Sequence, residues 1–284
     1  MTVFLNGQFL PISEAKVSVL DRGFIFGDGV YEVIPVYSRQ IFRLPEHLQR
    51  LRRSLDNIQL PNPYQDEEWI SIIRELVSRN EPEDQYLYLH ITRGVAKRDH
   101  AFPNPPVPAT VFLMSNPLNT PPARLLQSGI SAITAPDNRW LRCDIKAISL
   151  LPNVLLRQMA IYAGCAETIM IRDNEFMTEG AASNIFVVKN GGLLAPPKDH
   201  LMLPGITYDV VLELAASNNI PRQVRKVLLR ELLNADELLL TSSTKEVLAI
   251  TQLDEKLVGT GKPGPMFEKL YGLYQKFKQE IMRA

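Results

Sequence analysis

The segment between residues 117 and 129, PLNTPPARLLQSG, most constrains the fold, because the pattern of apolar residues changes across it. The segment holds three prolines and has neither a helical nor a strand period, which is typical of a boundary between domains. A chain of 284 residues is long enough for two domains of ordinary size. We therefore expect a small N-terminal domain over 1–117, an interdomain linker over 118–129 and a large C-terminal domain over 130–284.

The N-terminal part carries the signals of a sheet with two helices. Asn6-Gly7 separates two short apolar runs in VFLNGQFL, which predicts a hairpin. Further strands are predicted for GVYEVIPVY, YLYLHITRG and TVFLMS, and Pro35 indicates that the first of these is bulged or lies at an edge there. Apolar residues recur at helical spacing from Pro45 to Ile58 and again in DEEWISIIRELVSRN.

Strand and helix patterns alternate in the C-terminal part. Strands are predicted for ISAITA, ETIMIRD, SNIFVVKNGGLLAP and ELLLTSS. Helices are predicted from about 153 to 163, for ITYDVVLELAASNN, and for the closing segment PMFEKLYGLYQKFKQEIMRA. The mixture predicts an α/β (α+β) fold of two domains, with an active site in the crevice between them.

Composition and charge exclude several classes of protein. The 31 basic residues are balanced by 31 acidic ones, whereas a nucleic-acid-binding protein usually has a basic excess. No apolar run is long enough to span a membrane, and the N-terminus lacks a signal-peptide layout. Cys143 and Cys165 cannot form a disulfide framework, and no spacing typical of zinc occurs, so we expect no metal and a reducing compartment, the cytoplasm.

Lys146 lies in RWLRCDIKAISLLPNVLLRQMA, between a polar turn and a long apolar run. If this segment folds inward, desolvation lowers the pKa of the amine and makes it nucleophilic. The alternative is a lysine that extends its ammonium out of a core strand into water. The local sequence leaves both interpretations open.

Two segments could bind a phosphate. In LPGITYDVV, Gly205 precedes Ile206 and Thr207, whose free N–H groups would face an anion at the start of a helix. The alternative is an ordinary N-cap by Thr207. In LLLTSSTKE, a strand ends in a run of hydroxyls that could bind a phosphate, although such runs are also common in loops.

Two other segments hold charged side chains that could bind a ring or a carboxylate. Glu179 precedes a run of small residues in EFMTEGAASNIFVV, where a carboxylate could pair with a ring nitrogen or simply lie solvated in a turn. Arg98 and His100 in ITRGVAKRDHAFP are two residues apart, so an extended backbone would direct both toward one carboxylate. The alternative is a loop with charged side chains and no ligand.

The short motifs of other enzyme classes are missing. The sequence contains no GxxxxGK[ST] phosphate loop, no GxGxxG turn and no GxSxG nucleophile elbow. A nucleophilic lysine, a phosphate-binding helix start and a carboxylate for a ring nitrogen together match the three reactive handles of pyridoxal 5'-phosphate.

The chain resembles the fold-type IV pyridoxal-phosphate enzymes, the class IV aminotransferases, over nearly its whole length. This family includes branched-chain aminotransferases, D-amino acid transaminases and aminodeoxychorismate lyases. The resemblance is greatest to the bacterial D-amino acid transaminases, through DRGFIFGDGVYEV, ITRG with RDHAFP, RWLRCDIK and TEGAASNIF.

The resemblance implies roles for individual residues. Lys146 looks like the lysine that forms a Schiff base with the cofactor and later moves the substrate proton, and Glu179 like the carboxylate that faces the pyridine nitrogen. The cofactor-binding residues implied in this way are Arg50, Lys146, Glu179, Leu203, Ile206, Thr207 and Ser243. The implied binding residues for the substrate carboxylate are Tyr31, Arg98 and His100.

The implied reaction is transamination between a D-amino acid and a 2-oxo acid such as 2-oxoglutarate or pyruvate. In the family the arginine and histidine come from the partner subunit, so the resemblance also implies a homodimer. An L-branched-chain aminotransferase, an aminodeoxychorismate lyase and a binding protein without catalysis are the alternatives. The chain departs from the family pattern at Tyr208, usually Arg or Lys, and at Ala195, often Thr.

Overall fold

The structure, a computed structural model, describes residues 1–282 and begins with the hairpin that Asn6-Gly7 predicts. Strand β1 (Thr2–Leu5) pairs antiparallel with β2 (Gln8–Pro11). Asn6 and Gly7 have φ angles of 47° and 89°, the left-handed values that a two-residue hairpin turn of type I′ requires. Asparagine and glycine adopt these values most readily, which confirms the prediction.

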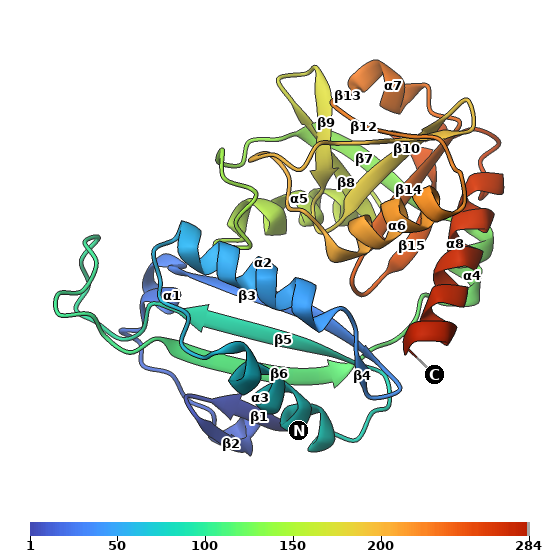
Figure 1. The fold of residues 1–284 in the computed structure, drawn as a ribbon. Helices are drawn as coiled ribbons and strands as arrows, with labels where there is room; N and C mark the ends of the chain where they lie inside the picture. The colour runs from blue at the N-terminus through green and yellow to red at the C-terminus, as the bar shows by residue number, and fades with distance from the viewer. Residues whose placement is uncertain (283–284) are drawn as a thin grey trace. The chain divides into compact units, whose positions relative to one another are not determined.

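The chain divides into two units (Figure 1). The first unit comprises Met1–Asn119 together with Ile145–Leu150, and the second comprises Thr120–Asp144 and Leu151–Met282. The predicted linker contains a short helix, α4 (Ala123–Ser128), which belongs to the second unit. Whether each unit folds by itself as a domain stays a prediction.

Within residues 1–282, the first unit contains a six-stranded antiparallel sheet in the order β2-β1-β6-β5-β3-β4. Its other strands are β3 (Gly29–Tyr37), β4 (Gln40–Ile41), β5 (Gln85–Thr92) and β6 (Thr110–Pro117). Strand β4 pairs only with Val36 and Tyr37, and the register of β3 with β5 runs unbroken through Pro35. Pro35 therefore lies next to the sheet edge, where its carbonyl accepts from the Phe42 N–H at 2.9 Å, and no bulge forms there.

One face of this sheet is covered by helices, and this decides where the side chains of β3 point. Helices α2 (Leu44–Asn57) and α3 (Asp66–Ser78) share a core with β3, β5 and β6. The first unit also contains α1 (Arg22–Phe26) and the 3₁₀ helix η1 (Ile12–Glu14). Side chains alternate along a strand, so Val30, Glu32 and Ile34 are buried, whereas Tyr31 and Val33 on the other face are half-buried.

The second unit is built on a mixed sheet of ten strands within the described part of the chain. Nine strands follow the order β12-β11-β10-β14-β15-β7-β8-β9-β13, and β16 pairs with β15. Three pairs are parallel, β11 with β12, β15 with β7 and β7 with β8. The strands are β7 (Ile130–Pro136), β8 (Glu167–Arg172), β9 (Phe176–Gly180), β10 (Asn184–Lys189), β11 (Gly192–Ala195), β12 (Arg222–Val224), β13 (Val227–Leu228), β14 (Glu237–Ser242), β15 (Glu246–Leu253) and β16 (Lys256–Leu257).

Helices of the second unit pack against this sheet. Besides α4, they are α5 (Leu151–Tyr162), α6 (Ile206–Ser217), α7 (Leu229–Leu233), α8 (Pro265–Phe277) and the π-helix η2 (Lys278–Met282). Residues 283 and 284 of the predicted closing helix lie outside the described residues. The sheets and helices confirm the predicted mixed α/β class. In residues 1–282, no helix combines the length and the apolar character needed to cross a membrane.

Candidate active site

Lys146 is anchored to the first unit through its backbone. The Lys146 N–H donates to Ser54 Oγ at 3.3 Å, and the Lys146 carbonyl accepts from the N–H of Tyr31 at 3.0 Å. The neighbouring Ile145 and Ala147 pack into the core of the same unit. The half-buried side chain places Nζ 4.1 Å from the centroid of the Tyr31 ring, a distance typical of a cation–π contact. The structure thus brings together two of the predicted site residues, Lys146 and Tyr31.

Arg50 lies on α2 and is held by a buried carboxylate. Arg50 Nε and Nη2 donate to Glu32 Oε1 and Oε2 at 2.8 and 2.7 Å, and His47 Nδ1 lies 2.8 Å from Glu32 Oε2. Burial raises the pKa of Glu32, but Arg50 and His47 outweigh it and hold that pKa well below its usual range. Glu32 is therefore a fixed negative charge that orients Arg50.

His47 leaves one buried nitrogen without a partner. Its side chain is fully buried, and Nε2 has no hydrogen-bond partner within residues 1–282. Sequence reasoning missed both Glu32 and His47. The available signal was the spacing of His47 and Arg50, three residues apart on one helix face.

Arg98 and His100 lie together on an exposed loop of the first unit. The Arg98 guanidinium lies 5.5 Å from the centroid of the Phe26 ring, and the His100 ring lies 5.3 Å from it. Within residues 1–282, no hydrogen bond or ring contact joins either side chain to Tyr31. The structure therefore brings together two of the three predicted carboxylate-binding residues in one chain.

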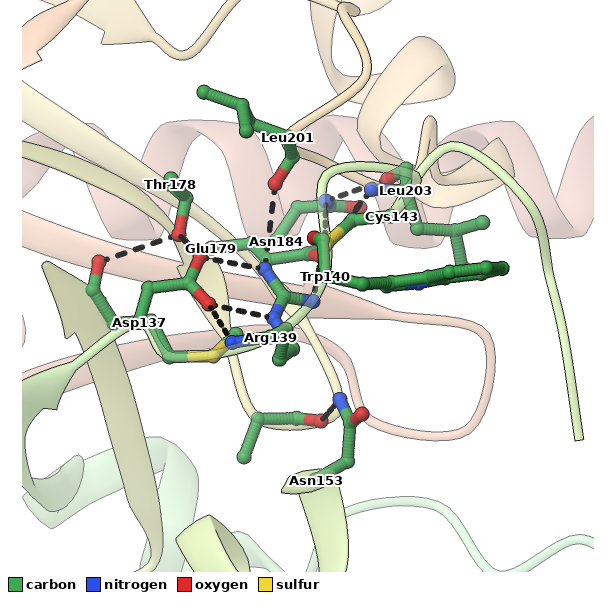
Figure 2. A network of polar contacts seen from close by, with 12 residues as sticks. Asp137, Arg139, Trp140, Cys143, Asn153, Thr178, Glu179, Asn184, Leu201 and Leu203 are labelled. Atoms are coloured by element: carbon green, nitrogen blue, oxygen red, sulfur yellow. Dashed lines mark hydrogen bonds and ion pairs between the residues drawn. The ribbon is translucent and has the colours of Figure 1, made fainter. Parts of the chain in front are cut away.

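Glu179, at the end of β9, is surrounded by donors in the second unit. Arg139 Nη1 donates to Glu179 Oε1 at 2.6 Å (Figure 2), and Asn184 Nδ2 donates to Oε2 at 3.2 Å. The Leu203 N–H lies 3.2 and 3.3 Å from the two oxygens. Burial raises the pKa of Glu179 to about 7, and Arg139 and the Leu203 N–H oppose that rise. Near neutral pH this carboxyl is therefore partly protonated, and a positively charged ring nitrogen beside it would favour its ionised form.

A second carboxylate holds Arg139 from the other side. Arg139 Nε and Nη2 donate to the two oxygens of Asp137 at 3.0 and 2.9 Å, and Asp137 also accepts from Thr178 Oγ1 at 2.7 Å. A guanidinium that bridges two buried carboxylates fixes the orientation of both. Sequence reasoning missed Asp137, Arg139 and Asn184; the local signal for the first two was an acid and an arginine two residues apart.

The start of α6 presents free backbone donors. Gly205 is the N-cap residue, and no side chain caps the helix, so the ordinary cap by Thr207 is not formed. Thr207 is 2% exposed, yet its Oγ1 has no hydrogen-bond partner in the described part of the chain. A Cβ at position 205 would lie 2.1 Å from Asn184 Oδ1, which explains why glycine is needed. The predicted phosphate group fits this 12-residue helix, since an anion would satisfy the unpartnered hydroxyl and the free N–H groups.

The remaining predicted residues and the two departures also belong to the second unit. Ser243 is half-buried in the turn between β14 and β15, and Leu203 contributes its N–H to Glu179. Tyr208 is fully buried, stacks on Phe186 with ring centroids 4.9 Å apart and donates its hydroxyl to the Pro196 carbonyl at 2.7 Å. Ala195 is also fully buried, so both departures from the family pattern are core positions.

Relatives of known activity match the chain almost end to end. A D-alanine aminotransferase of Staphylococcus haemolyticus is 39% identical over 275 residues, which cover 97% of each protein. A D-alanine aminotransferase of Bacillus licheniformis is 42% identical over 269 residues, which cover 94% of this chain and 93% of the relative.

Solved structures of branched-chain amino acid aminotransferases share the fold. The enzyme from Escherichia coli superposes with a TM-score of 0.89 at 26% identity, over 96% of this chain and 92% of that one. The enzyme from Thermoproteus uzoniensis, solved with norvaline, superposes with a TM-score of 0.86 at 28% identity, over 98% of this chain and 94% of that one. A further branched-chain enzyme of this fold was solved with pyridoxamine 5'-phosphate and superposes with a TM-score of 0.90 at 27% identity, over 97% of this chain and 93% of that one. The sequence profile of the family "Amino-transferase class IV" matches residues 29–253. The chain belongs to the class IV aminotransferases.

Proposed function

We propose that this enzyme transfers the amino group of a D-amino acid to a 2-oxo acid, with pyridoxal 5'-phosphate as its cofactor. The observation that carries the choice of D-amino acids is the Arg98–His100 pair: both side chains lie against the ring of Phe26, and an arginine with a histidine suits a substrate carboxylate. The identity of 39–42% to D-alanine aminotransferases over nearly the whole chain supports it. The branched-chain enzymes share the fold at 26–28% identity.

The site residues then have the following roles. When bound, pyridoxal phosphate supplies an aldehyde for the amino group and a ring that accepts an electron pair. Lys146 would hold the cofactor through the carbon of that aldehyde, and its amine would move the proton at the substrate Cα. Glu179 keeps a proton on the ring nitrogen, and Leu203 supports the ring. The residues that bind the phosphate are Arg50, Ile206, Thr207 and Ser243, and those that bind the substrate carboxylate are Tyr31, Arg98 and His100.

Thr207→Val separates the stability of the protein from its affinity for the cofactor. The Thr207 hydroxyl is buried without a partner, so valine should leave the unfolding free energy of the cofactor-free protein unchanged or raise it by about 1 kcal/mol. The same change should weaken pyridoxal phosphate binding by roughly tenfold, because the phosphate loses a donor. Denaturant unfolding and an absorbance titration with the cofactor measure the two effects.

Thr251→Val is the matched control. Thr251 Oγ1 is buried but donates to the Ser128 carbonyl at 2.8 Å, so valine should lower stability and leave cofactor affinity unchanged. Equal cofactor affinity for Thr207→Val and the wild type would remove Thr207 from the phosphate site.

A substrate panel tests the proposed reaction. The cofactor-loaded protein is mixed separately with D-alanine, D-glutamate, L-leucine and aminodeoxychorismate, and the absorbance of the bound cofactor is followed. The D-amino acids should bleach the band of the resting enzyme and release the matching 2-oxo acid. Bleaching by L-leucine alone would favour a branched-chain enzyme, and pyruvate released only from aminodeoxychorismate would favour a lyase.

We also propose that the enzyme is a homodimer in which the partner supplies Arg98 and His100. Helix α5 exposes apolar side chains along one face, an arrangement that favours self-association. They are Leu151 at 68% exposure, Val154 and Leu155 at 59%, Met159 at 46% and Tyr162 at 83%. The lack of contact between Tyr31 and either Arg98 or His100 within residues 1–282 also supports a contribution from a second copy.

Complementation between two weak variants tests this sharing. Arg98→Ala and Lys146→Ala are mixed, dissociated and re-paired, and activity is measured at low D-alanine concentration. If Arg98 acts across the dimer, each mixed dimer holds one intact site, and random pairing restores roughly a quarter of wild-type activity. No recovery, with a dimer still seen by sedimentation, would place Arg98 and Lys146 of one chain at the same site.

We infer that the enzyme works in the cytoplasm. Both cysteines, Cys143 and Cys165, are free thiols, which suits a reducing compartment. Fractionation of cells of the source organism would contradict this inference if the activity appeared outside the cytoplasmic fraction.

A further inference from the structure

The loop that carries Arg98 and His100 is held from beneath by one buried arginine. Arg22, on α1, is only 3% exposed. Its Nη1 donates to the carbonyls of Asp99 and Ala101 at 2.6 and 3.2 Å, and its Nη2 donates to the carbonyl of His100 at 3.4 Å. A single planar guanidinium thus binds three consecutive backbone carbonyls. We call residues 98–101 the carboxylate-binding loop.

The ring of Phe26 links Arg22 to the side chains of this loop. Phe26 belongs to the same short helix as Arg22, and the Arg22 guanidinium lies 4.9 Å from its ring centroid. Arg98 and His100 contact the same ring at 5.5 and 5.3 Å. Arg22 therefore sets the backbone of the carboxylate-binding loop, and the ring beside it sets the direction of both side chains.

Asp28 binds Arg22 and also binds a second arginine, Arg93. Arg22 Nε donates to Asp28 Oδ2 at 2.8 Å, and Arg93 Nε and Nη2 donate to Asp28 at 2.8 and 3.0 Å. Burial raises the pKa of Asp28, but Arg93 and Arg22 outweigh it and hold that pKa below its usual value. Loss of Arg22 would leave Asp28 paired with Arg93, so its removal leaves no unpaired buried charge.

From these contacts we infer that Arg22 is a positioning residue for recognition of the substrate carboxylate, and this inference rests on the role proposed above for Arg98 and His100. Arg22 acts through the carboxylate-binding loop and does not touch the substrate. A loop fixed before the substrate arrives loses little freedom on binding, and the carboxylate gains the full benefit of two directed donors. Without Arg22 the loop keeps its charges but loses their fixed geometry.

Arg22→Met tests this inference in the cofactor-loaded enzyme. The KM for D-alanine and the inhibition constant of propionate, a plain carboxylate, should both rise by roughly 10- to 100-fold. The rate of cofactor bleaching by D-alaninol, which has no carboxylate, should stay at the wild-type value. Arg22→Lys keeps the charge beside Asp28 but lacks the fork that reaches three carbonyls, so its KM for D-alanine should be intermediate.

Arg39→Met is the matched control. The Arg39 guanidinium also binds three backbone carbonyls and a carboxylate of the first unit, but none of these acceptors belongs to the loop that carries Arg98 and His100. Its acceptors are the carbonyls of Val77, Asn80 and Glu81 and the side chain of Glu83. This variant should keep the wild-type KM for D-alanine and the wild-type inhibition constant of propionate.

The outcomes separate this inference from the proposed function. If Arg22→Met reacts more slowly with D-alaninol by the same factor as with D-alanine, Arg22 has a general structural role. If the KM for D-alanine is unchanged, Arg22 has no role in binding the carboxylate. Either result overturns the inference if Arg98→Ala still weakens the binding of D-alanine and propionate but leaves the reaction with D-alaninol unchanged. If Arg98→Ala has no selective effect, the loop does not bind the carboxylate and both proposals fail.

Discussion

Replacing Lys146 by alanine is expected to lower the turnover of D-alanine by roughly 10⁴-fold, the upper end of the usual contribution of a positioned proton-transfer group. The expectation follows from the place of the amine, 4.1 Å from the Tyr31 ring, with its backbone fixed by Ser54 and Tyr31. We propose Lys146 as the covalent attachment of the cofactor, so the characteristic visible band should also disappear in this variant. Single-turnover absorbance measurements report both losses.

Lys189→Ala is the control for general effects of losing a lysine. Lys189 pairs with Asp236 on the surface of the second unit, at 2.9 Å, and its removal should leave turnover unchanged. Reduction with borohydride followed by peptide mapping then locates the attachment site directly. A label on any lysine other than Lys146, or turnover of Lys146→Ala within a few-fold of wild type, would refute the assignment.

Replacing Arg139 by methionine is expected to produce the largest loss of stability, about 3–5 kcal/mol in the unfolding free energy at pH 8. Arg139 and its two partners, Asp137 and Glu179, are all buried, so the change leaves Glu179 without its cation. Asp137 keeps only its second ion pair, to Arg172 at 3.2 Å. The pKa of Glu179, already raised to about 7, should rise further without Arg139. Protonation of Glu179 then relieves its unpaired charge, so this part of the loss should grow as the pH rises above 7 and nearly vanish as the pH falls below 7.

Arg142→Met is the matched control on the same segment. Arg142 pairs with Asp144 at 3.2 Å in a solvent-exposed position, so its loss should change stability little at any pH. Denaturant unfolding of the cofactor-free proteins between pH 5 and 8 makes the comparison. A loss for Arg139→Met that does not depend on pH would show that Glu179 does not take up the proton.

The sequence predicted the elements whose signals are local. The Asn6-Gly7 hairpin and helices α2, α3, α6 and α8 follow from turn chemistry and apolar periodicity, and all are present. Strands β9 and β15 were not predicted. They are buried almost throughout, so they lack the alternation of polar and apolar residues that marks a half-exposed strand. Glu179 made β9 resemble a turn, because its compensating cation, Arg139, lies 40 residues away.

The residues of the candidate site likewise fall into two groups, those that the sequence predicted and those that it did not. Lys146, Glu179 and Arg50 could be found because long segments around them resemble a known family. Glu32, Arg139 and Asn184 were missed, since each contacts a side chain that is remote in sequence or on another element. Asp137 was missed although its partner Arg139 is two residues away, because that spacing alone does not show that both side chains are buried. Arg22 shows the limit most clearly: its acceptors are backbone carbonyls about 77–79 positions away, and no spacing of residue types records such a contact.

The segment around Lys146 determines where this enzyme can be cut into two fragments. Residues Ile145–Leu150 belong to the first unit, although the chain on both sides of them belongs to the second. A break after Asn119 would therefore release a C-terminal fragment that contains Lys146 but not its backbone partners Ser54 and Tyr31. No single cut of the chain therefore separates the two units with all their residues. A split-protein design would also have to move residues 145–150 into the fragment that contains the first unit.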